Sequence, residues 1–182
     1  MDWTGRLCVA TILPGDAIRC DNGPHTLCVS LCTLSIEMLT QVRADQLHAM
    51  PKVLSGTAPA RFPQPGQFCQ LDVVSVDGRE AFVIDVNRKG TLKLTKCTYQ
   101  ERYAVIEILV RLDIDGPVHE NPDGVEVPTP HVHMFREGFG DRWAAPISTA
   151  DFSDTTDLQK TFTEFLGFCH VQAPANMQRG LF

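Results

Sequence analysis

The segment YAVIEILVRLDID, residues 103–115, constrains the fold more than any other part of the sequence. Its even-numbered positions from Ile106 to Ile114 are all apolar, whereas its odd-numbered positions include Glu107 and Arg111. Successive side chains of a β-strand point to opposite faces, so this alternation predicts a strand with one face on a hydrophobic core. The other face is expected to meet solvent or a cleft.

Further strands are predicted on both sides of this segment. Upstream, QFCQLDVVSV and REAFVIDVNR flank Asp77-Gly78, one of the strongest short-range signals for a β-hairpin. Lys89-Gly90 then leads into TLKLTK, so residues 67–96 are interpreted as a three-stranded antiparallel meander. Downstream, HVHMFRE at residues 131–137 is predicted to be another short strand.

Two helices are expected at the ends of this sheet. Thr40 is a suitable N-cap for a helix that runs to Pro51. Near the other end, Ser153 or Asp154 is expected to cap a second helix, whose apolar stripe should pack on the sheet. That stripe consists of Leu158, Phe162, Phe165, Leu166 and Cys169. The predicted fold class is α+β, with an antiparallel sheet of about five strands, an N-terminal helix and a C-terminal packing helix.

The domain organisation follows from a change in sequence character near Met38. Residues 1–37 show no sustained period, and we interpret them as a mis-annotated or disordered extension, with Met38 as the natural start. Residues 38–172 are predicted to form a single α+β domain and residues 173–182 a flexible tail. No apolar run approaches the length of a membrane span and no signal peptide is evident, so we expect a cytoplasmic protein that does not bind membranes. The cysteines, seven in number, are expected to be free thiols.

The histidines are the candidate site. His131 and His133 alternate on one strand and therefore share a face. If that strand pairs with residues 104–115, Arg111 and Asp113 lie beside them, and His119 comes from the connecting loop. The sequence thus predicts three of its six histidines, an arginine and an aspartate on one sheet face.

Three interpretations of this group stay open. The imidazoles could hold a divalent metal, which is the single cofactor the sequence suggests. Alternatively, a histidine moves a proton at a phosphodiester, Arg111 stabilises the developing charge and Asp113 orients an imidazole. In the third interpretation the polar side chains bond to one another and fix the long loop.

A basic cluster lies in an otherwise acidic chain, whose net charge is −6. Glu101 is the single anion between residues 88 and 102. Such a run is typical of a solvated face, and it can also contact phosphates. The candidate nucleic-acid-binding residues are Arg88, Lys93, Lys96 and Arg102.

Two resemblances extend this interpretation. The segments SVDGREAFVIDVNRKGTLKLTKCTYQERY, RLDIDGPVHENPDG, PHVHMFREGFGDRWAAP and DLQKTFTEFLGFC resemble a domain-of-unknown-function family of bacterial and mobile-element proteins, from about Met38 to Val171. More distantly, the arginine–aspartate pair, the third histidine and the P-H-x-H element are similar to small toxins of TumE type. That resemblance covers about thirty residues and implies a ribonuclease-like toxin. It matches Arg111, Asp113, His119, His131 and His133, whereas the NPDG insertion departs from the toxin pattern.

The sequence therefore favours a small phosphodiesterase-like protein, of the endoribonuclease toxin kind, from a defence or mobile element. Its expected partners are RNA and a cognate antitoxin or another protein. The alternative is a non-enzymatic module that binds a protein through the polar sheet face, in a defence or anti-defence role.

Overall fold

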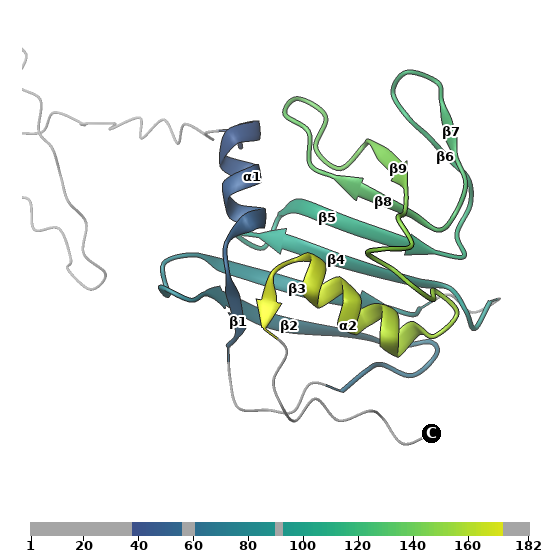
Figure 1. Ribbon diagram of the computed structural model, residues 1–182, viewed down its shortest axis with the longest axis horizontal. Coiled ribbons are helices and arrows are strands. Elements are labelled where there is room, and N and C mark those ends of the chain that lie inside the picture. The colour runs from purple at the N-terminus through teal and green to yellow at the C-terminus, as the bar shows by residue number, and fades with distance from the viewer. Residues whose placement is uncertain (1–37, 56–60, 90–92, 173–182) are drawn as a thin grey trace, which may run out of the picture. The chain divides into compact units, whose positions relative to one another are not determined.

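A computed structural model describes residues 38–55, 61–89 and 93–172 of the chain. The predictions for residues 1–37 and 173–182 lie outside these residues. Figure 1 labels the helices and strands. In chain order they are α1 (Gln41–Ala49), β1 (Lys52–Leu54), β2 (Phe68–Ser75), β3 (Ala81–Asn87), β4 (Cys97–Tyr103), β5 (Glu107–Ile114), β6 (His119–Glu120), β7 (Glu126–Val127), β8 (His131–Met134), β9 (Ala144–Pro146), α2 (Leu158–Phe168) and β10 (Val171–Gln172).

Eight strands form one sheet in the order β10-β1-β2-β3-β4-β5-β8-β9, and β6 pairs with β7 in a separate hairpin. The α+β class is confirmed, but the expected number of about five strands is wrong. The additional strands β1, β9 and β10 have three, three and two residues, too short to show alternation in the sequence. All pairs in the large sheet are antiparallel except β1 with β10, which are parallel.

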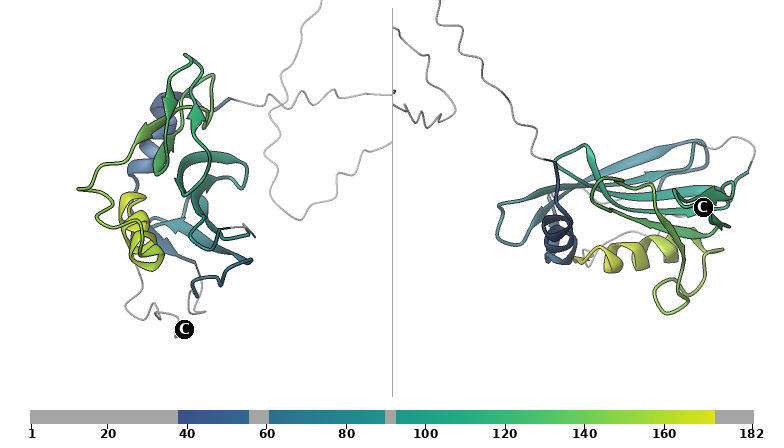
Figure 2. Two further views of the ribbon diagram at one scale, coloured as in Figure 1. Left: turned by 90° about the vertical axis from the view of Figure 1, so that its right-hand side faces the viewer. Right: turned by 90° about the horizontal axis from the view of Figure 1, so that it is seen from above.

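Both helices lie on the same side of the sheet (Figure 2). Thr40 caps α1 as predicted, because its side chain accepts a hydrogen bond from the backbone N–H of Arg43. The prediction of Ser153 or Asp154 as the cap of α2 is wrong. Asp157 takes this position and accepts hydrogen bonds from the first-turn backbone. Neither helix in the described residues is long and apolar enough to cross a bilayer.

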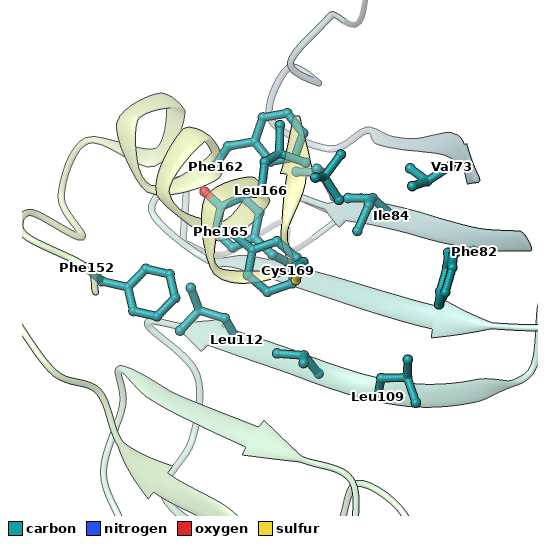
Figure 3. Close-up of a cluster of buried hydrophobic side chains, with 14 of the residues drawn as sticks. Val73, Phe82, Ile84, Leu109, Leu112, Phe152, Phe162, Phe165, Leu166 and Cys169 are labelled. Carbon is teal, nitrogen blue, oxygen red and sulfur yellow. The ribbon is translucent and has the colours of Figure 1, made fainter. Parts of the chain in front are cut away.

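The hydrophobic core lies between α2 and the sheet. Figure 3 shows Phe162, Phe165 and Leu166 of α2 directed toward the strands, where they meet Ile84 and Leu112. The side chains of Phe165 and Leu166 are fully buried, which stabilises the fold by about 1.5–3 kcal/mol for each. The prediction that the α2 stripe packs on the apolar sheet face is therefore confirmed.

The third strand of the meander is displaced from its predicted position. Residues 93–96 form a turn and lie outside any strand, and the strand β4 begins at Cys97. The first two residues of the predicted strand, 91–92, lie outside the described residues. In β4 the buried positions alternate through Cys97, Tyr99 and Glu101, and the charge of Glu101 concealed this pattern in the sequence.

A β-bulge divides β5 into two halves with opposite side-chain directions. The register against β4 shifts between Glu101 and Arg102, and this inserts Leu109 as an additional residue. The predicted apolar face is therefore confirmed from Val110 to Ile114, but it is wrong for Ile108 and for Ile106, which is 75% exposed. Leu109 enters the core instead.

Lys52 connects the two helices to the sheet from inside the core. Its ammonium donates to the carbonyl oxygens of His48 and Met50 at the end of α1 and to that of Cys169 at the end of α2. Unpaired carbonyls at helix C-termini carry partial negative charge, so a cation stabilises both helix ends at once.

Candidate functional site

The strand pairing brings the predicted polar residues together. β5 and β8 are antiparallel neighbours, with Arg111 opposite His133 and Asp113 opposite His131. Directly opposed residues project from the same face, and here it is the face opposite the core residue Leu112. The expectation that the two strands pair is confirmed, and the four side chains form one cluster.

His119 joins this cluster from β6. Its ring centroid lies 4.5 Å from that of His133 and 5.7 Å from that of His131, and the latter two centroids are 4.8 Å apart. Asp141, which the sequence did not single out, binds Arg111 through Nη1. We call these six residues the histidine cluster: Arg111, Asp113, His119, His131, His133 and Asp141.

Each imidazole of the histidine cluster is held by a backbone carbonyl. Nδ1 of His131 lies 3.2 Å from the oxygen of Pro128, and Nδ1 of His133 lies 2.9 Å from that of Asp141. Nε2 of His119 lies 3.0 Å from the oxygen of Arg142. A carbonyl can only accept, so these ring nitrogens carry the proton. In the neutral rings the remaining nitrogen keeps its lone pair.

Asp113 is the centre of the histidine cluster. Its Oδ1 accepts a hydrogen bond of 2.6 Å from Thr98, and its Oδ2 accepts one of 3.0 Å from Nε of Arg111. Oδ2 also lies 3.3 Å from Nε2 of His133 and 3.7 Å from Nε2 of His131. Burial is the largest influence and would raise the pKa of Asp113, but its contacts with His133 and Thr98, together with the charge of Arg111, hold it well below its usual range.

Arg111 packs against the face of His133. Its Nη2 lies 3.2 Å from Nδ1 and 2.9 Å from Nε2 of that ring. A hydrogen bond along the in-plane lone pair of one ring nitrogen would leave the other nitrogen much farther away. The guanidinium therefore stacks on the imidazole, and Asp113 and Asp141 fix it from two sides.

Exposure separates the cluster into two groups. His131 and His133 are 2% and 0% exposed, and burial lowers the pKa of His131. The side chains of Arg111 and Asp113 keep exposures of 24% and 22%. His131 and His133 thus hold their neighbours in place from the buried side of the cluster. Arg111, Asp113 and the partly exposed His119 can contact a ligand.

A comparison with family models gives one match. Residues 39–171 match the model of DUF6978, a family of unknown function. The chain belongs to the DUF6978 family. Neither the comparison with curated proteins nor that with solved structures gives a match. The distant likeness to TumE-type toxins stays a prediction.

The cations predicted to bind nucleic acid are engaged to different degrees in this DUF6978 domain. Arg102 donates to both carboxylate oxygens of Asp85, and Arg88 donates to the carbonyls of Pro63 and Leu94. Lys93 pairs with Asp115 at 2.9 Å, with 61% of its side chain exposed. Lys96 is exposed as well. Phosphate binding by these cations stays a prediction. The exposed Lys93 and Lys96 are better placed for it than the two arginines, whose donors are already engaged.

A groove of about 510 Å³ lies on the open face of the DUF6978 sheet. Its lining combines polar side chains with the exposed apolar side chains of Phe68, Val105 and Ile106. Lys89 Nζ lies 4.0 Å from the centroid of the Phe68 ring. The lining residues are Phe68, Gln70, Asp85, Asn87, Lys89, Thr98, Gln100, Arg102, Val105, Ile106 and Ile108.

The groove and the histidine cluster share two rows of side chains that cross five strands in register. Cross-strand partners project from one face, so each row is continuous. The first row is Phe68, Asn87, Thr98, Asp113 and His131, and the second is Gln70, Asp85, Gln100, Arg111 and His133.

Proposed function

We propose that this chain is a phosphodiester-cleaving enzyme that acts on single-stranded RNA. The observation that carries the proposal is the continuity of the two rows from the groove to the histidine cluster. The rows cross four strand spacings, or roughly 19 Å, which gives room for several nucleotides. The phosphate to be cleaved would lie at the histidine cluster, and bases of neighbouring nucleotides would lie in the groove.

His119 is the proton-transfer group in this proposal. Its Nε2 is committed to the carbonyl of Arg142, so the lone pair on Nδ1 can accept a proton. His119 takes the proton of a ribose 2′-hydroxyl, O2′ bonds to phosphorus, and the bond to the 5′-oxygen breaks. Water protonates the leaving 5′-oxygen. The products are a 2′,3′-cyclic phosphate and a 5′-hydroxyl end.

Arg111 supplies the positive charge for the transition state. It is 24% exposed, and its two aspartate contacts fix the guanidinium before substrate arrives. A preorganised cation stabilises the charge that develops on the phosphorane oxygens. Asp113 orients Arg111, and His133 holds the ring of His119 edge to face.

The groove binds bases next to the cleaved bond. Phe68 is 54% exposed and offers a ring face on which a base can stack. Gln70, Asn87 and Gln100 line the groove, and their amides can donate and accept hydrogen bonds to base edges. Lys89, above Phe68, is placed to meet the backbone phosphate of the same nucleotide.

Cleavage of a single-stranded RNA pool with randomised sequence tests the proposal. The full chain should produce 2′,3′-cyclic phosphate ends and should leave DNA of the same sequences intact, because DNA lacks the nucleophile. His119→Asn should lower the rate by about 10²–10⁴-fold. Arg111→Lys should lower it by about 10²–10³-fold.

His170→Asn is the matched control, because His170 is an exposed imidazole outside the histidine cluster. It should cleave RNA at the wild-type rate. An inactive wild-type chain, or a His119→Asn variant as active as wild type, would reject the proposal. Melting curves of all variants must overlap before the rates are compared.

Within this proposal, the enzyme is a toxin of a defence or mobile element, as the resemblance to TumE-type toxins implies. Inducible expression in bacteria should then arrest growth and degrade cellular RNA. His119→Asn should remove both effects at equal expression. Arrest without RNA loss would contradict the toxin interpretation.

A second candidate function, docking of a protein partner on the open sheet face, is favoured by a different observation. His131 and His133 are buried and bonded to backbone carbonyls, as in a cluster that only fixes loops. The exposed Val105 and Ile106 would contact the partner. In that case Ile106→Arg removes the growth arrest, His119→Asn keeps it, and no RNA is cleaved.

A further inference from the structure

Three ligand atoms of the histidine cluster converge in a way that the cleavage proposal does not use. Oδ2 of Asp113 lies 3.3 Å from Nε2 of His133 and 3.7 Å from Nε2 of His131. The three residues place their ligand atoms within 4.8 Å of one another. Donor atoms about 2.0–2.2 Å from a tetrahedral ion are separated by about 3.3–3.6 Å. The distance from Asp113 to His133 falls in this range, and that from Asp113 to His131 is slightly longer.

The outer contacts of the two histidines match those of metal ligands. A histidine that binds metal through one ring nitrogen usually donates its other N–H to a carbonyl or carboxylate. Nδ1 of His131 and Nδ1 of His133 each face a carbonyl oxygen, at 3.2 and 2.9 Å. With both protons on Nδ1, two lone pairs and a carboxylate oxygen face one another. Such an arrangement favours a cation beside it, and in the structure the guanidinium of Arg111 supplies one through its contacts to Asp113 Oδ2 and His133 Nε2.

We propose that Asp113 Oδ2, His131 Nε2 and His133 Nε2 bind one divalent transition-metal ion, such as Zn²⁺. Two imidazoles and one carboxylate are ligands that suit this class of ion. The fourth position faces the exposed edge of Asp113 and accepts water or an anionic oxygen. The inference does not depend on RNA cleavage.

Arg111 makes room for the ion without leaving the cluster. Its Nε contact to Asp113 and its Nη2 contact to His133 involve the atoms that would bind the metal. Its Nη1 bond to Asp141 is separate and stays intact. The ion, Asp113, Asp141 and Arg111 together carry a net charge of about +1, which favours an anionic fourth ligand.

Metal content of the untagged full chain tests the inference. After loading with Zn²⁺ and dialysis, wild type should retain one equivalent by mass spectrometry of the metal. Asp113→Asn keeps the shape of the side chain and should weaken Zn²⁺ binding at least about a hundredfold. The double variant His131→Asn and His133→Asn should retain no ion.

The matched control is the double variant His48→Asn and His170→Asn, which removes two imidazoles outside the cluster and should retain one equivalent. Co²⁺ replaces Zn²⁺ in a second measurement, because the chain has seven cysteines that could capture metal. The expected spectrum has visible bands and lacks near-ultraviolet thiolate charge transfer. Thiolate bands, a metal-free wild type, or retention of one equivalent by Asp113→Asn would overturn the inference.

If the histidine double variant does not fold, as judged by circular dichroism, Asp113→Asn decides the outcome alone. Zinc should raise the melting temperature of wild type and leave that of Asp113→Asn unchanged. Metal binding without RNA cleavage rejects only the proposed function. Cleavage that continues in a chelator, with no metal bound, rejects only this inference.

Discussion

Lys52 Nζ lies 3.0 Å from Glu101 Oε1, and neither side chain is exposed to solvent. The three N–H groups of the ammonium already donate to three backbone carbonyls, so Glu101 Oε1 is an ion-pair partner without a hydrogen bond of its own. Nδ1 of His48 lies 3.3 Å from the other carboxylate oxygen. The pair joins both helices to the middle of the sheet.

Removal of this ammonium should be severely destabilising. Lys52→Met leaves Glu101 buried without a counter-charge and three carbonyls without a donor. We expect a loss of about 3–5 kcal/mol in the free energy of unfolding, measured with urea at pH 7. Lys160→Met, at an exposed position of α2, is the control and should change it by less than about 0.5 kcal/mol. A loss below 1 kcal/mol at Lys52 would contradict a structural role for the pair.

Aromatic side chains on the two sides of the sheet, Phe165 of α2 on the covered side and Phe68 of β2 on the open side, should respond differently to the same substitution. Phe165→Ala removes a fully buried ring and should cost about 3–5 kcal/mol of stability. Phe68→Ala removes an exposed ring, so its effect on stability should stay within about 0.5 kcal/mol. RNA affinity should fall by about 1–3 kcal/mol for Phe68→Ala, as measured by fluorescence anisotropy. Equal RNA affinity would remove Phe68 from the binding groove.

The bulge in β5 predicts opposite outcomes for neighbouring positions. Leu109 is 1% exposed and faces the core, whereas Ile108 lines the groove. Leu109→Ala should therefore cost about 2–5 kcal/mol. Ile108→Ala should cost clearly less, in thermal or urea unfolding. A larger loss of stability for Ile108→Ala than for Leu109→Ala would contradict the bulge and favour a strand that alternates without interruption.

The described thiols should be slow to alkylate in the native state. Burial raises the pKa of Cys69 to about 11 and that of Cys97 to about 11, and it raises that of Cys169 as well. A raised thiol pKa means less thiolate at pH 8, by about a hundredfold for a shift of two units. Peptide mapping after iodoacetamide treatment should show slow labelling that accelerates toward pH 11 and in urea. Rapid native labelling of Cys97 at pH 8 would contradict its burial.

Local signals predicted the elements that depend on neighbouring residues. The Thr40 cap, the hairpin turn at Asp77-Gly78 and the apolar stripe of α2 each involve a few adjacent positions. The pairing of residues 104–115 with the histidine strand was also predicted, because sequential strands usually neighbour one another. The prediction placed Arg111, Asp113, His131 and His133 together as the structure does.

Long-range contacts explain what the sequence could not reveal. Glu101 in an inward position of β4 looks like a break in the pattern unless its partner Lys52 is known. Likewise, Asp141 has no local signal as a partner of Arg111, which lies 30 residues away. The bulge at Leu109 depends on the register between strands, which no single segment specifies.

The parallel pairing of β1 with β10 has a consequence for synthesis on the ribosome. The Cys169 carbonyl, which accepts a hydrogen bond from the Lys52 ammonium, comes 117 residues later in the chain. At 5–20 residues per second, translation takes roughly 6–23 s to supply it. During that interval β1 lacks its partner strand β10, and the Lys52 ammonium lacks one of its carbonyl acceptors. This is the period in which a chaperone would bind the nascent chain.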